Sequence, residues 1–254
     1  MPTEPKIAHL AALRALISRQ VPGQMAPPPC PLGLPALDAA LEGGLPRGCL
    51  QEVIPADEGA AAAGFAAFLL GRLVKEAEGG GRGVLWASLG EGDLYPPALA
   101  AYGLAPGEVI LLSAPSPAEL LWAMEEALRC RPVGVVIGEV RSADRLDLVA
   151  SRRLSLAAGQ RDVCAFLLRT APGTDASAAA TRWTVAAAPS RANTAGPGPP
   201  RLSVHLTRNR RGPVGSWLVE WNRAQRRFDL APSLSEPVAD AACDRPHHAA
   251  ARGA

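Results

Sequence analysis

A predicted strand, loop and helix follow one another from residue 48 of this 254-residue chain, in the order typical of nucleotide-binding proteins. Gly48–Ile54 can form a buried strand, Pro55–Gly59 suits a turn, and the alanine-rich segment from Ala60 favours a helix with apolar residues on one face. This unit constrains the fold more than any other feature, because it predicts a strand inside a sheet with a helix packed against it.

The side chains that bind phosphate are missing from this unit. A working phosphate loop needs a glycine-rich backbone, a lysine for the β- and γ-phosphates, and a serine or threonine for magnesium. Alanines stand at the lysine and threonine positions, and neither of the chain's two lysines follows a glycine-rich turn. The sequence therefore predicts an ATPase-like architecture without ATP hydrolysis. The degenerate nucleotide loop comprises Pro55, Asp57, Glu58, Gly59, Ala60, Ala61 and Ala62.

Several carboxylates bear on this prediction. A loop that still holds nucleotide through its backbone N–H groups is the alternative, although Asp57 and Glu58 would repel phosphate there. Glu139 follows an apolar strand, and Glu91 lies in a Gly-Glu-Gly-Asp turn. Glu139 and Glu91 are each either a carboxylate of an ATPase site or a solvated loop residue, and we favour the second interpretation. We expect no catalytic residues, no cofactor and no metal site.

Strands and helices alternate along the first two thirds of the chain, which predicts an α/β fold with a doubly wound, mostly parallel sheet. Strands are expected at 48–54, 83–88, 108–112, 132–137 and 162–168, and helices at 34–42, from 60 onward, and at 96–102, 116–129 and 144–158. Ser116 and Asp144 are the expected N-caps of the last two helices.

The pattern changes after residue 170. The segment Ala171–Pro200 is rich in small residues and proline, and Thr181–Val185 interrupts it as a short strand. Arg201–Leu206, Trp217–Trp221 and Arg227–Leu230 then predict an antiparallel meander at the edge of the sheet.

The chain divides into four predicted parts. Residues 1–24 form an N-terminal helix, 25–31 a linker, 32–230 the core, and 231–254 a disordered tail rich in alanine and proline. The helix carries one apolar stripe, which packs either on its own core or on another chain. The stripe consists of Ile7, Leu10, Leu13 and Ile17.

Positive charge is concentrated in residues 201–227, which carry seven arginines and one glutamate, so that this segment is +6 and the rest of the chain −4. Such a segment either faces a polyanion or is a solvated arginine-rich surface. The tryptophans nearby either stack on bases or belong to the core, and 171–200 is either a DNA-binding loop or inert. The candidate DNA- or partner-binding residues are Arg182, Trp183, Arg208, Arg210, Arg211, Trp217, Trp221, Arg226 and Arg227.

The five cysteines are scattered and lack CxxC spacing, and the sequence shows no apolar leader and no apolar run of membrane-spanning length. These features predict a cytoplasmic protein. Cys243 with His247 and His248 is too weak a pattern to predict a metal site. His205 alternates with the apolar residues of its strand and is expected to be structural.

The order of these elements resembles the RecA-like core, with Gly33–Asp38 and Gly43–Gly48 similar to the lead-in of RecA proteins. Within that superfamily the chain resembles the ImuA family, the accessory proteins of inducible mutagenesis. The resemblance rests on Thr181–Trp183 followed by Ala186–Ser190, and on Leu206–Trp217, and it extends over residues 5–230.

This resemblance implies a cytoplasmic, non-catalytic RecA-like adaptor in translesion DNA synthesis, a distant relative of RecA and SulA. It implies as partners an ImuB-like homologue of Y-family polymerases and a DnaE2-like error-prone polymerase. RecA and single-stranded DNA are further expected partners, and a membrane is not. Two alternatives stay open: a RecA-like ATPase with an atypical phosphate loop, and a SulA-like inhibitor of cell division.

Overall fold

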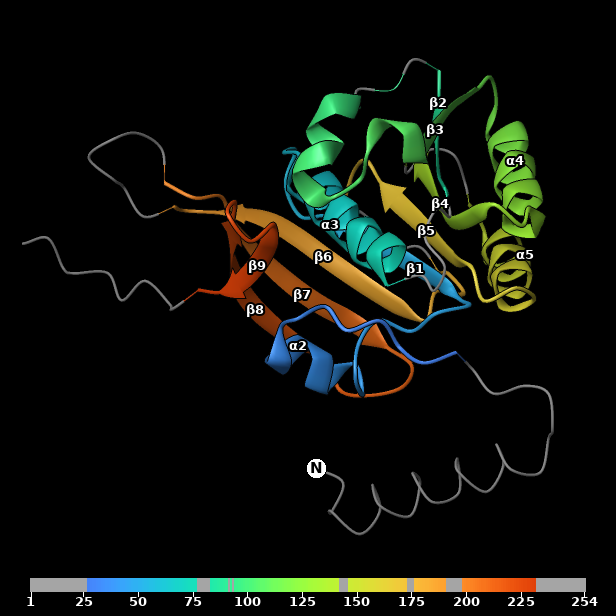
Figure 1. The fold of residues 1–254 in the computed structure, drawn as a ribbon. Coiled ribbons are helices and arrows are strands. Elements are labelled where there is room, and N and C mark those ends of the chain that lie inside the picture. The colour runs from blue at the N-terminus through green and yellow to red at the C-terminus, as the bar shows by residue number, and fades with distance from the viewer. Residues whose placement is uncertain are drawn as a thin grey trace, which may run out of the picture.

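The structure is a computed structural model that describes residues 27–76, 83–90, 92, 94–141, 146–172, 176–190 and 198–231. Its strands are β1 Leu50–Pro55, β2 Gly83–Leu89, β3 Val109–Ala114, β4 Val133–Val140, β5 Cys164–Arg169, β6 Thr181–Ala188, β7 Arg201–Asn209, β8 Gly215–Asn222 and β9 Arg227–Leu230. They form one sheet in the order β3-β2-β4-β5-β1-β6-β7-β8-β9 (Figure 1). The strands from β3 to β6 in that order are parallel, and β6 to β9 are antiparallel. The predicted α/β fold class is confirmed.

Helices cover both faces of the parallel half. They are α3 Ala61–Lys75, the 3-10 helices η1 Pro96–Tyr102 and η2 Pro106–Glu108, α4 Pro117–Arg129 and α5 Leu148–Gly159, whereas α2 Pro35–Ala40 lies beside the turn between β7 and β8. One apolar core packs α3 and η1 on the sheet, and a second packs α4 and α5 on the opposite face (Figure 1). The sheet is therefore doubly wound. Within the described ranges, no helix is long and apolar enough to cross a membrane.

Side-chain caps fix where α4 and α5 begin. Ser116 Oγ accepts the backbone N–H of Glu119 at 3.3 Å, so the predicted N-cap of α4 is confirmed. The predicted N-cap of α5 is wrong: Asp147 takes that position, and its Oδ1 accepts the N–H of Ala150 at 2.7 Å. Asp147 stands directly before the first helical residue, where its side chain reaches a backbone N–H that has no partner within the helix. Asp144 lies outside the described residues.

Strand β6 joins the two halves of the sheet. It pairs in parallel with β1 on one side and antiparallel with β7 on the other, and it extends to Ala188 rather than ending at Val185. Trp183 and Val185 are fully buried. The predicted short strand at Thr181–Val185 is therefore confirmed, and pairing on both sides places Arg182 and Trp183 in an interior strand rather than in a loop.

Candidate functional site

Asp57 fixes the loop between β1 and α3. Its Oδ1 accepts the N–H of Gly59 at 3.1 Å, and its Oδ2 accepts the N–H of Ala187 in β6 at 2.9 Å. A carboxylate of the chain itself therefore takes up a loop N–H just before α3, the region where a phosphate would bind in a working loop. Glu58 beside it is exposed, and Ala60 contributes no side-chain capping bond to α3. The loop thus offers negative charge where phosphate needs positive charge.

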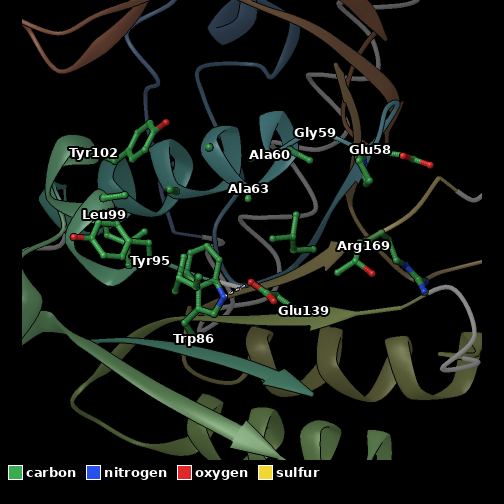
Figure 2. A pocket seen from close by; sticks show the side chains of 18 residues that line it. Glu58, Gly59, Ala60, Ala63, Trp86, Tyr95, Leu99, Tyr102, Glu139 and Arg169 are labelled. Atoms are coloured by element: carbon green, nitrogen blue, oxygen red, sulfur yellow. Dashed lines mark hydrogen bonds between the residues drawn. The ribbon is translucent and has the colours of Figure 1, made fainter. Parts of the chain in front are cut away.

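A cavity of about 480 Å³ lies beside this loop, at the carboxyl ends of the parallel strands (Figure 2). Ala63 of α3 and Leu99 of η1 line one side of it. Trp86 of β2 and Glu139 of β4 face it from the sheet. A crevice at the carboxyl ends of the strands is where open α/β sheets bind ligands.

Glu139 is not the solvated loop residue that was expected. It lies within β4, which continues beyond Ile137 to Val140, and it is half-buried. Its Oε1 accepts the indole N–H of Trp86 at 2.7 Å. Glu91 lies outside the described residues. Among the residues that are described, no three His, Cys, Asp or Glu side chains gather closely enough to hold a metal ion.

A buried ion cluster joins β1, β5 and β6. The carboxylate of Glu52, 1% exposed, accepts Nε–H bonds from Arg169 at 3.0 Å and from Arg182 at 2.7 Å. Ser177 Oγ donates a third bond to it at 2.8 Å. Charges removed from water must be neutralised by partners. These two arginines therefore balance the charge of Glu52 inside the fold, and the Nε–H of Arg182 is directed to this carboxylate rather than to solvent.

The candidate tryptophans belong to the core. Trp183 packs on Phe65 with ring centroids 5.4 Å apart, and Trp221, 6% exposed, packs on Tyr102 with centroids 4.9 Å apart. Trp217 is partly buried against the same core. Stacking on a nucleic-acid base requires an exposed ring face. Of the two alternatives, the core interpretation is therefore the one that fits Trp183 and Trp221.

Asn209 orders the arginine-bearing turn between β7 and β8. Its Nδ2 donates to the carbonyls of Ala40 at 2.9 Å and Pro213 at 3.0 Å, and its Oδ1 accepts the N–H of Arg211 at 3.1 Å. The turn is thereby held against the end of α2, and Arg210 and Arg211 are both exposed on it.

Arg208 lies half-buried at the base of this turn. Its Nη1 donates to the carbonyl of Ser177 at 2.6 Å. Burial, followed by the positive charges of Arg210 and Arg182, lowers the pKa of Arg208. Cations that repel one another are stabilised by a bound anion, so this turn is the described part of the predicted basic surface best suited to phosphate.

The second arginine turn, between β8 and β9, lies at the other end of the meander. Strand β8 separates the two turns, and its eight residues span roughly 25 Å. Arg226 is exposed there, and Arg227 pairs with Asp229 at 2.9 Å. The structure therefore does not bring Arg226 and Arg227 together with Arg208, Arg210 and Arg211.

Three further arginines were missed. Arg47, Arg131 and Arg161 precede β1, β4 and β5, so they lie at the amino edge of the parallel sheet. The turn that carries Arg210 lies at the same edge, because the backbone N–H of Arg210 donates to the carbonyl of Ala180, just before β6. A signal was available: each of the three stands just before a predicted strand, and parallel strands start at one edge.

One of the remaining predictions, for His205, is confirmed, and the others concern residues outside the described ranges. His205 is structural as predicted, since its ring nitrogens hydrogen-bond Ser203 at 2.8 Å and Ser216 at 2.7 Å. The N-terminal stripe, the tail, and Cys243 with both tail histidines lie outside the described residues.

Together these features define a class of protein: an α/β fold compatible with a RecA-like core, in which the loop between β1 and α3 lacks the lysine and threonine of a phosphate site. No protein-family model matches the chain. Two curated relatives, each called Protein ImuA, come from Caulobacter vibrioides strains NA1000 / CB15N and ATCC 19089 / CIP 103742 / CB 15. Each is 34% identical to the chain over 209 residues, which cover 76% of the chain and 83% of the relative. The chain belongs to the ImuA family.

Proposed function

We propose that this protein is a non-catalytic accessory protein of inducible translesion DNA synthesis. Membership of the ImuA family supports the mutagenesis role. The bond from the Gly59 N–H to Asp57 supports the absence of ATP hydrolysis, because it places a carboxylate where the ATPase alternative needs a phosphate cradle. The protein acts by binding other macromolecules rather than by turning over nucleotide.

Its protein partners are an ImuB-like polymerase homologue and a DnaE2-like polymerase, with RecA as a further one, all in the cytoplasm. The apolar stripe of residues 7–17 serves as the partner helix, since an isolated helix of that length is not stable in water and must pack on something. Affinity capture of the full chain from DNA-damaged cells tests this choice. Polymerase components in the captured fraction support it, and a cell-division protein in their place supports the SulA-like alternative.

The arginine turn between β7 and β8 contacts single-stranded DNA. Arg210 and Arg211 are exposed there, and the pKa of Arg208 is lowered first by burial and then by the charges of Arg210 and Arg182, a crowding that a phosphate relieves. Arginine fits this role because its planar guanidinium binds phosphate oxygens through two hydrogen bonds.

The double variant Arg210→Ala/Arg211→Ala tests this contact. Binding of single-stranded oligonucleotides should weaken with salt with a slope of about −0.7 per neutralised phosphate, and the variant should make that slope shallower by about one phosphate or two. Arg226→Ala/Arg227→Ala, at the opposite end of β8, is the matched control and should change it less. An unchanged slope in the first variant, with partner capture lost, would make the turn a protein-docking surface instead.

A further inference from the structure

The cavity beside the degenerate loop has walls made mainly of carbon. Ala63 and Ala67 of α3, Leu99 of η1 and the rings of Trp86 and Tyr102 contribute to its lining (Figure 2). Its volume of about 480 Å³ lies within the range of known ligand sites. The described residues therefore retain a cavity at the nucleotide position, although the loop beside it is built against phosphate.

Two carboxylates and one arginine line this cavity. Glu58 is exposed beside the loop with its carboxylate directed away from Trp86, and the half-buried Glu139 lies beside Trp86 (Figure 2). The guanidinium of Arg169, which also lines the cavity, bonds Glu52 and extends away from Trp86 (Figure 2). Carboxylates next to apolar walls attract a cation more strongly than they would in open water.

We propose that this cavity binds an arginine side chain of a partner protein. The flat guanidinium can lie against the exposed ring of Tyr95, and its paired N–H groups match a carboxylate such as that of Glu139. The apolar stem of arginine fits the alanine-lined wall of α3. A protein is the occupant, rather than a small metabolite, because Tyr95 at the cavity is 69% exposed, and exposed aromatic rings frequently anchor protein interfaces.

A matched pair of small probes tests the charge requirement on the unmodified chain. N-acetyl-arginine amide and N-acetyl-citrulline amide have nearly the same shape, but only the first is a cation. In calorimetric titrations of the full chain at low ionic strength, the arginine probe should bind with a Kd of about 1 mM or tighter, and at least about tenfold more tightly than the citrulline probe. Equal affinities, or no binding of either probe, would overturn the proposal.

Substitutions then locate the site. Glu139→Gln keeps an oxygen for the Trp86 N–H but removes the charge, so the preference for arginine over citrulline should fall to about onefold to threefold. Glu119→Gln, an exposed carboxylate on α4, is the control and should keep the full preference. If Glu139→Gln lowers the melting temperature, Glu58→Gln at the exposed mouth provides the same test without a buried change.

Ala63→Trp fills the cavity and should abolish binding of both probes while the chain stays folded. Sedimentation of the unmodified chain tests whether the occupant of the cavity is a second copy of this chain. If the chain self-associates and Ala63→Trp dissolves the assembly, the occupant is a second copy and the proposal of a different partner is wrong. The arginine-turn variant Arg210→Ala/Arg211→Ala should bind the probes unchanged, so this inference stands or falls separately from DNA binding.

Discussion

The two edges of the parallel sheet carry different charged residues beside their candidate sites. At the carboxyl edge, Asp57 and Glu58 lie in the loop, and Glu139 lies at the cavity. At the amino edge, arginines precede β1, β4 and β5, and the turn after β7 adds two more. An α/β sheet that binds a nucleotide does so at its carboxyl edge. This chain keeps a cavity at the edge where α/β proteins bind nucleotides, whereas the phosphate contacts that we propose lie at the other edge.

Substitution of Glu52 should have the largest effect on stability, because this carboxylate neutralises Arg169 at the carboxyl edge. Glu52→Gln should leave Arg169 and Arg182 buried without a balancing charge and cost about 3–5 kcal/mol. For a domain of this size that loss should lower the melting temperature by roughly 10 °C, which a thermal melt measures.

The control for this prediction is Glu58→Gln, a carboxylate of the same half that is exposed and should change stability by less than about 0.5 kcal/mol. If Glu52→Gln melts within a degree or two of the unmodified chain, the cluster is not a structural unit. Arg169 and Arg182 would then not have the structural role that distinguishes them from the exposed arginines.

Alkaline titration tests the amino edge, where Cys49 lies just before β1. Burial raises the pKa of Cys49 from 9.0 to about 11, against the lowering effect of Arg211 and Arg210. The unfolded chain therefore loses this proton first, so the free energy of unfolding should fall as pH rises from 9 to 11. The loss should be about 1–2 kcal/mol, allowing for the partial exposure of this residue.

Chemical denaturation at pH 8, 9, 10 and 11 measures this slope, and Cys49→Ser should make it shallower by about that amount, leaving the slope due to Cys30 and Cys164, whose pKa values burial also raises. Removing the arginines sharpens the test: in Arg210→Ala/Arg211→Ala the pKa of Cys49 should rise further, because two charges that lower it are gone. If the thiol pKa stays the same in that variant, the arginine turn does not lie close to the amino end of β1.

Much of this fold could be predicted from local pattern. The apolar run at Val133–Ile137 and the serine at position 116 each specify a structure within a few residues of themselves. Element ends were less predictable, because β4 runs on to Val140 by pairing with β5, and β6 reaches Ala188 by pairing with β7. These extensions depend on distant partners, which periodicity does not reveal.

The candidate site was less predictable than the fold. A charged residue such as Glu52 inside a buried strand was a visible anomaly, but its partners Arg169 and Arg182 lie more than a hundred residues away. Arginines at two successive turns looked like one surface, because nothing local shows that a strand carries its two ends to opposite edges of a sheet. Burial likewise decided the role of Trp183 and Trp221, which composition left open.

The central claim is that a nucleotide-site architecture persists here without nucleotide binding, and the thermal response to Mg-ATP tests it most directly. A ligand at 100 times its Kd stabilises a fold by about 2.7 kcal/mol. We expect no change in the melting temperature of the full chain with millimolar Mg-ATP. A clear rise that disappears when residues 57–64 are replaced would contradict it, because the loop would then hold phosphate despite Asp57.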